Sequence, residues 1–324
     1  MAITLTQLRS FLAVARTGSV TAAADELVVT QPSVSAAVTA LTREVGTELT
    51  ERVGRSVRPT PAGAAFVPYA ADVIGLLDQG ARAAREAAGA AARELRIAAV
   101  TTAGEHIVPP LMEAFGSRHP EIAMTVDVGN RQRVFDRLIG HQADIGIGGR
   151  PPAEGGLASM RFLDNPIVIL CAQSDPLAGR RSVRPEELAE RAWLLREEGS
   201  GTRALTEEFL ASHDLRPRTL TLGSNGAIKQ AARAGLGVAL QSRLAAGLEL
   251  ELGLLATIGI DTPLPRRHWY LLRPERSRPR SIVEEFVAFA RGADGRRVIA
   301  EATHAWVAAR ESVHADPQGA ARTR

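Results

Sequence analysis

This chain has almost no cysteine, almost no lysine and few aromatic side chains. Of its 324 residues one is a cysteine, Cys171, and 4% are aromatic. A single cysteine excludes an intramolecular disulfide, and because Cys171 lies in the apolar run 167–172 we expect a buried structural thiol. Lys229 is the only lysine among 39 basic residues. Either position 229 needs a compact ammonium group rather than a planar guanidinium, or its lysine has survived by chance.

Further absences limit the class of protein. No apolar run is long enough to cross a bilayer and no signal peptide opens the sequence, so we expect a cytoplasmic protein without a membrane partner. The seven histidines have no metal-ligand spacing, and no Gly-x-Ser-x-Gly elbow, His-Glu-x-x-His site or Walker loop occurs. We therefore expect no metal, no cofactor and no catalytic residue. Because the net charge is only +3, any binding to DNA depends on where the charges are placed.

Residues 18–41 have the pattern of two short helices joined by a tight turn. Ser19 can cap the first helix, Thr30 can cap the second, and Pro32 fits the first turn of the second. Apolar side chains recur in the second helix at helical spacing and predict a buried stripe of Val34, Val38 and Leu41. The opposite face is small and uncharged, which lets a helix lie deep in a DNA major groove; it consists of Ser33, Ala36, Ala37 and Ala40. On these residues alone, an ordinary helical hairpin is an equal alternative.

The flanking sequence favours a DNA-binding domain. Thr4 and Gln7 have capping-box spacing and predict an earlier helix. Gly54 can turn a β-hairpin, or wing, whose arginines reach for DNA phosphates. We therefore expect a winged helix-turn-helix domain in residues 1–60. Its expected contacts with double-stranded DNA are Thr30, Gln31, Pro32, Ser33, Ser35 and Ala36, together with the wing residues Arg52, Arg55 and Arg58.

This N-terminal region resembles the LysR-type bacterial transcriptional regulators. The matching positions are Leu5, Leu8, Phe11, Gly18, Ser19, Ala23, Ala24, Leu27, Gln31, Pro32, Ser33, Ser35, Glu51, Arg52, Gly54, Arg55, Thr60, Pro61, Ala62 and Gly63. Ala36 departs from the basic or polar residue of many members, and Thr50 departs from a usual phenylalanine. The resemblance implies a transcriptional regulator with a small-molecule effector that assembles as a homodimer or homotetramer, and it is compatible with a contact to RNA polymerase.

Residues 61–89 predict one long linker helix. Thr60 can cap it, Pro61 fits its first turn, and its apolar stripe consists of Phe66, Tyr69, Val73, Leu76 and Leu77. Its second half is mostly alanine with arginine and glutamate and has little to bury in a monomer. Because helix-turn-helix proteins usually read two half-sites, we expect this helix to pair with a second copy.

Residues 90–292 alternate between strand and helix patterns, which predicts open, parallel-rich α/β sheets. Strands are expected at 95–100, 122–128, 143–149, 166–172, 192–195, 220–222, 238–241 and 268–272, with a loop at 101–106 before a helix that reaches Phe115. One lobe comprises 95–164 and 267–292, and the other 165–266. Two crossovers make a bilobed, periplasmic-binding-protein-like effector domain, which the LysR resemblance also implies. Residues 293–324 form a C-terminal extension, which suits an added helix or a partner contact.

Four strand-to-helix corners carry hydroxyl or amide donors and free backbone N–H groups, where open α/β sheets bind ligands. Helix capping alone explains each corner taken singly, but four that converge favour an anion. The expected effector-binding residues are Thr101, Thr102, Asn130, Ser200, Thr202, Asn225 and Lys229.

This half of the chain most resembles the Calvin-cycle operon regulators, over 100–103, 128–131, 148–152, 199–203 and 223–230. That resemblance implies a phosphorylated sugar, an organic phosphate or a reduced cofactor as effector. Together with the four corners it favours a small anion, with a phosphorylated metabolite preferred over a carboxylate. The alternatives are a regulator of an unrelated pathway with an aromatic or neutral effector, and a cytosolic binding protein or enzyme without DNA function.

Overall fold

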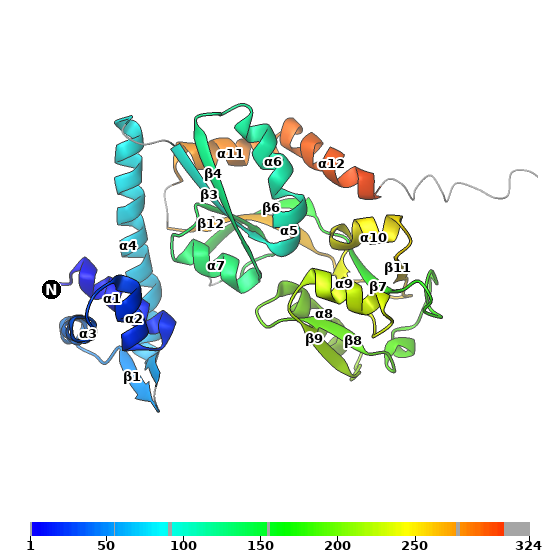
Figure 1. Cartoon of the computed structure of the whole chain (residues 1–324), viewed down its shortest axis with the longest axis horizontal. Helices are drawn as coiled ribbons and strands as arrows, with labels where there is room; N and C mark the ends of the chain where they lie inside the picture. The colour runs from blue at the N-terminus through cyan, green and yellow to red at the C-terminus, as the bar shows by residue number, and fades with distance from the viewer. Residues whose placement is uncertain (1, 55, 90–92, 154–155, 277–278, 308–324) are drawn as a thin grey trace, which may run out of the picture. The chain divides into compact units, whose positions relative to one another are not determined.

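The structure is a computed structural model that describes residues 2–54, 56–89, 93–153, 156–276 and 279–307, without the side chains of 304–307 (Figure 1). It divides into two compact units. The first contains 1–92 with the short segments 137–143 and 274–278, and the second contains 93–136, 144–273 and 279–324. No helix of the described residues is both long and apolar enough to cross a membrane.

Three helices form the core of the first unit: α1 (Leu5–Thr17), α2 (Val20–Leu27) and α3 (Gln31–Val45). The predicted capping box is present, since the Gln7 N–H donates to Thr4 Oγ1 at 3.3 Å and the Thr4 N–H donates to Gln7 Oε1 at 2.8 Å. Ser19 and Thr30 cap α2 and α3 as predicted. The predicted stripe of α3 is buried with Phe11 and Leu49 in one cluster. The helix-turn-helix geometry is therefore confirmed.

The wing follows as two antiparallel strands, β1 (Thr50–Val53) and β2 (Ser56–Pro59), with Arg52 opposite Val57. Gly54 adopts φ +63° at the turn, a conformation that favours glycine. The Val57 N–H donates to the Gly18 carbonyl at 2.9 Å, which joins the wing to the end of α1. Arg55 lies outside the described residues.

The predicted linker helix is α4 (Pro61–Ala87), capped by Thr60, whose Oγ1 accepts from the Gly63 N–H at 3.0 Å. Phe66 packs against Phe11 with ring centroids 5.8 Å apart. The rest of the predicted apolar stripe is exposed in the single chain, with exposed fractions of 54% for Tyr69, 49% for Val73, 41% for Leu76 and 50% for Leu77.

The second unit contains the bilobed α/β effector domain. Its first lobe has a five-stranded sheet in the order β4 (Ile122–Gly129), β3 (Arg93–Val100), β5 (Ile145–Gly148), β12 (His268–Pro274) and β6 (Leu157–Asp164). β3 pairs in parallel with β4 and β5, and the returning strand β12 is antiparallel to β5. The helices of this lobe are α5 (Thr101–His106), α6 (Val108–Gly116), α7 (Arg131–Ile139), α11 (Ser281–Arg291) and α12 (Ala293–Val307).

In the second lobe, β7 (Ile167–Ala172) lies between β10 (Ala239–Ser242) and β11 (Leu255–Ile258), antiparallel to both. β8 (Trp193–Arg196) and β9 (Thr219–Leu222) form a parallel pair. Around them lie α8 (Gly201–Ser212), α9 (Asn225–Arg233), α10 (Gly247–Glu251) and the 3-10 turns η1 (Pro185–Leu188) and η2 (Arg243–Ala246). Figure 1 shows α8 and α9 beside β8 and β9. The centre of this lobe is therefore more antiparallel than the sequence predicts.

The structure also differs from the sequence-based expectations in one loop and two strands, and it shows what the C-terminal extension forms. The predicted loop 101–106 is the helix α5, which begins directly after β3. Strands β6 and β11 are not predicted, because most side chains of β6 are exposed or half-buried and β11 has only four residues. The C-terminal extension contributes α12, which packs on α6, α11 and α10 with Ile299 in the core. Ala309 and the polar end of the extension lie outside the described residues.

A buried carboxylate fixes the centre of the first lobe. Asp144 accepts hydrogen bonds from the Arg96 backbone N–H at 2.9 Å and from the Arg96 and Arg280 guanidinium groups at 2.9 and 2.8 Å. Its side chain is 2% exposed. Burial alone raises the pKa of Asp144, but the hydrogen bonds and charge of Arg96, together with the charge of Arg280, outweigh it and hold the pKa below its usual value. The ionised carboxylate thus joins β3, β5 and the start of α11.

We expect Asp144→Asn to destabilise the effector domain by about 3 kcal/mol or more, because it takes the charge of Asp144 away from the buried Arg280 and the half-buried Arg96. Since the folded pKa lies below the unfolded value of about 3.9, this stabilisation is complete above that pH and is lost as the pH falls through the folded pKa. Calorimetry from pH 8 to 3 measures the difference from the unsubstituted protein. The exposed pair of Asp294 with Arg118 supplies the control, since solvent screens it and Asp294→Asn should cost far less than Asp144→Asn. An equal cost for both variants would contradict this account.

Candidate DNA-binding face and effector cleft

The predicted reading face of α3 is exposed. Gln31, Pro32, Ser33, Ser35 and Ala36 are all exposed and lie opposite the buried stripe. Thr30 Oγ1 and Ser33 Oγ lie 2.8 Å apart, so these two hydroxyls form a hydrogen bond at the helix N-terminus. Arg52 and Arg58 are exposed on the two strands of the wing. Short neutral side chains on the helix and cations on the wing match the two tasks of base contact and phosphate contact.

In the effector domain, a cleft forms where β3, β4, β8 and β10 end. Three of the four predicted corners meet there and contribute Thr101 and Thr102, Gly129 and Asn130, and Ser200 with Thr202. The enclosed volume is about 30 Å³, and a neighbouring hollow of about 320 Å³ shares Arg131 and Ser200 with it. A ligand larger than a water molecule must therefore extend into the hollow or move the lobes apart.

The predicted side chains in the cleft are already hydrogen-bonded to the protein itself. Thr101 Oγ1 donates to the Gly129 carbonyl at 3.3 Å, and Asn130 Nδ2 donates to the Glu198 carbonyl at 3.2 Å. Ser200 caps α8 by accepting from the Thr202 N–H at 3.2 Å. Asn130 thus joins the two lobes, and the capping interpretation is correct for Ser200.

Asn225 does not line the cleft, but it connects both lobes behind it. Its Nδ2 donates to Thr102 Oγ1 at 3.1 Å, and its Oδ1 accepts from Arg196. Arg196 also holds Glu197 in a two-point ion pair, with N–O distances of 2.7 and 2.9 Å. Lys229 lies elsewhere, since its Nζ is 2.7 Å from Glu249 Oε1 between α9 and α10.

The sequence analysis missed three arginines that line the cleft: Arg131, Arg196 and Arg267. Arg267 Nη1 donates to Thr202 Oγ1 at 3.2 Å, and the guanidinium of Arg131 lies 5.9 Å from the centre of the Phe135 ring. Burial, with a smaller contribution from the charge of Arg131, lowers the pKa of Arg267 to about 10. No acidic side chain of the described residues forms an ion pair with Arg131 or Arg267. The two cations thus lie near each other, and the closest carboxylates around the cleft, Glu198 and Glu207, line the neighbouring hollow without an ion pair to either of them.

The backbone adds positive potential at the same place. A Cβ on Gly201 would lie 2.5 Å from Arg267 Nη2, so the glycine lets the guanidinium approach the first turn of α8. The N-terminus of a helix carries partial positive charge. One feature of the sequence could have pointed to Arg267 as a cleft residue. It directly precedes β12, and the chain must pass the cleft there because it returns from the second lobe to the first. Arg131 follows the predicted Asn130 directly.

The described residues also show what the remaining histidines, carboxylates and the cysteine do. No cluster of three or more histidine, cysteine or carboxylate side chains able to hold a metal ion occurs there. Cys171 is fully buried, as predicted, and burial raises the pKa of its thiol to about 12. Such a thiol is not poised for redox chemistry.

The chain matches two protein families, one over each half. Residues 5–64 match the "Bacterial regulatory helix-turn-helix protein, lysR family", and residues 88–294 match the "LysR substrate binding domain". The chain belongs to the LysR family. It is a DNA-binding transcriptional regulator, and the LysR resemblance drawn from its motifs is confirmed.

Named relatives place it within the Calvin-cycle subgroup of the family. It is 35% identical to the HTH-type transcriptional activator CmpR of Synechocystis sp., over 87% of this chain and 92% of that protein. It is 37% identical to the RuBisCO operon transcriptional regulator of Allochromatium vinosum, over 84% of this chain and 90% of that one. Among solved structures, the Synechocystis CcmR regulatory domain in complex with 2-PG matches with a TM-score of 0.58 and 32% identity, over 60% of this chain and 94% of that domain.

Proposed function

We propose that this regulator senses a small anionic metabolite in the effector cleft, preferably one that carries a phosphate. The main support is the pair Arg131 and Arg267, which lie in the cleft beside the N-terminus of α8. Neither forms an ion pair with an acidic side chain of the described residues. A phosphate or carboxylate between them would neutralise charge and accept charge-assisted hydrogen bonds. The 2-PG in the related CcmR domain belongs to the same chemical class.

In this proposal the hydroxyls of Thr101, Thr102, Ser200 and Thr202 and the amide of Asn130 complete the donor set. Asn225 supports it through Thr102, whereas Lys229 is engaged by Glu249 and has no direct part. Because the bound anion contacts both lobes, it favours one angle between them and thereby shifts the DNA-binding state. The chain then acts as a regulator rather than an enzyme, in the cytoplasm where bacterial DNA lies, with RNA polymerase as a further partner.

The first test uses 2-phosphoglycolate as the probe with the full-length protein. We expect it to raise the melting temperature and to change affinity for DNA from upstream of the protein's own gene. Arg267→Met should weaken binding of the probe at least tenfold and should raise the melting temperature without ligand, because it removes a partly buried charge that has no ion-pair partner among the described residues. Thr202→Ala should weaken the ligand and leave DNA binding without ligand unchanged. Calorimetry and thermal unfolding measure these effects.

Matched controls for these variants are Arg216→Met and Thr219→Ala, both at exposed positions of the second lobe. Neither should alter ligand affinity. If neutral aromatic compounds bind in the cleft while phosphorylated and carboxylated metabolites all fail, the proposed effector class is wrong. DNA binding by itself would survive that outcome.

We also propose that Gln31, Ser33 and Ser35 read base edges, with Ala36 and Ala37 against thymine methyl groups, while the wing arginines bind phosphates. Arg52→Ala and Arg58→Ala should each weaken binding to all DNA sequences alike and reduce the salt dependence by about one unit of slope. Fluorescence titrations at several salt concentrations measure both effects, and Arg85→Ala on α4 is the control. A changed preference at one base pair with an unchanged slope would refute the phosphate role. The proposed phosphate contacts of the wing include Arg55 as well.

The exposed stripe of α4 supports a homodimer, since an isolated helix surface of this kind is otherwise left in water. We expect Val73→Glu to shift the full-length protein toward smaller assemblies in sedimentation velocity, because a charge would replace an apolar contact. Ala64→Glu, at an exposed position on the opposite side of the same helix, should have no such effect. A homotetramer through the effector domains rests on family resemblance alone. Monomeric sedimentation of the unsubstituted protein at micromolar concentration would contradict both contacts.

A further inference from the structure

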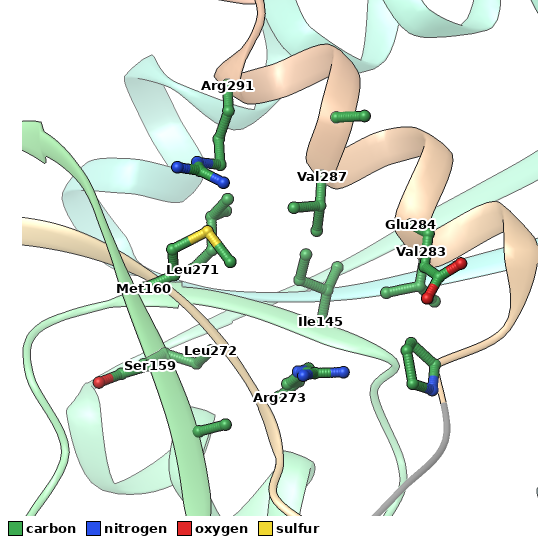
Figure 2. A pocket seen from close by; sticks show the side chains of 13 residues that line it. Ile145, Ser159, Met160, Leu271, Leu272, Arg273, Val283, Glu284, Val287 and Arg291 are labelled. Atoms are coloured by element: carbon green, nitrogen blue, oxygen red, sulfur yellow. The ribbon is translucent and has the colours of Figure 1, made fainter.

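A second cavity lies in the first lobe of the effector domain. It has a volume of about 450 Å³ and opens between α11, the edge strand β6 and the neighbouring strands β12 and β5 (Figure 2). None of its lining residues lines the effector cleft. Its volume is within the range of small-molecule sites. The cavity therefore lies at a different place in the fold from the effector cleft.

The inner surface of this cavity is apolar. Ile145 of β5 and Leu271 of β12 form its floor, and Val283 and Val287 of α11 form one wall. Met160 of β6 faces them, and its unbranched side chain can adapt to the shape of a ligand. An apolar floor of this kind disfavours a sugar phosphate, whose hydroxyls would lose their hydrogen bonds to water.

Two arginines bring positive charge to this apolar space. Figure 2 shows the guanidinium groups of Arg273 and Arg291 on opposite sides of the cavity, with Met160 and Ile145 between them. Glu284 is the only acidic side chain in the lining, and it lies at the edge. Neither arginine forms an ion pair within the described part of the chain. Elsewhere in this lobe Arg96, Arg118 and Arg133 are all paired with aspartates.

We propose that this cavity is a second ligand site, which takes a small monocarboxylate with an apolar aryl or alkyl body. The body fills the space over Ile145, Leu271 and Val287, and the carboxylate pairs with Arg273 or Arg291. A guanidinium can hold a carboxylate by two parallel hydrogen bonds. The site is independent of the proposed effector cleft, so either assignment can fail without the other.

The test is calorimetric titration of the full-length protein with 3-phenylpropionate, in the presence of saturating 2-phosphoglycolate. We expect one binding event per chain. The double variant Arg273→Gln/Arg291→Gln should bind at least tenfold more weakly, and the neutral 3-phenylpropionamide should be weaker than the acid by a similar factor. Ala288→Leu, which places a larger side chain in the lining, should weaken binding without a change of charge.

The controls separate this site from the cleft and from general damage. Arg267→Met and Ala211→Leu, an exposed alanine on α8, should bind 3-phenylpropionate as the unsubstituted protein does. Loss of binding in Arg267→Met would place the carboxylate in the cleft and overturn the proposal. Absence of binding at millimolar concentration would overturn it as well, and so would binding that the double variant retains. Thermal unfolding of the double variant checks that it is folded.

Discussion

The hydrogen bonds and ion pairs of the buried Asp144 carboxylate are the interaction on which both proposed ligand sites of the effector domain depend. It lies at the entry to β5, bonds to β3 through the Arg96 backbone, and holds Arg280 at the start of α11. The strand β3 ends in Thr101 and Thr102 of the cleft. The next residue, Ile145, and the helix α11 line the second cavity. Only an ionised carboxylate can satisfy two guanidinium groups and a backbone N–H at once, so one side chain sets the register of the strands and the position of a helix.

The sequence predicted local structure best where a residue acts through its own neighbours. Thr4, Ser19 and Thr30 cap the helices that follow them, and Val34, Val38 and Leu41 are buried, because capping and helical periodicity are local properties. β6 escaped prediction because an edge strand can leave both faces partly in water and so loses the alternating pattern. The loop expected at 101–106 is helical because tertiary packing outweighs the low helix propensity of threonine and glycine there.

The cleft shows why site residues are harder to derive than elements. Thr101, Asn130 and Ser200 were found because strand ends and helix starts are visible in the sequence. Arg267 was missed because its significance lies in what surrounds it: a second arginine, a helix N-terminus and no ion pair with an acid of the described residues. Arginine is so common in this chain that its occurrence alone carries little information. Lys229, the outlier by composition, is paired with Glu249 instead. The rarity of lysine in the sequence therefore did not indicate a ligand-binding role for Lys229.

The place of α4 in the chain has a consequence for assembly during synthesis. Its exposed apolar side chains follow the helix-turn-helix directly and precede every strand of the effector domain. Domains of a growing chain generally fold in order from the N-terminus. In the proposed dimer, two chains that leave neighbouring ribosomes on one messenger would therefore join through α4 while their effector domains are still being made. The DNA-reading pair would then be composed of sister products of a single transcript.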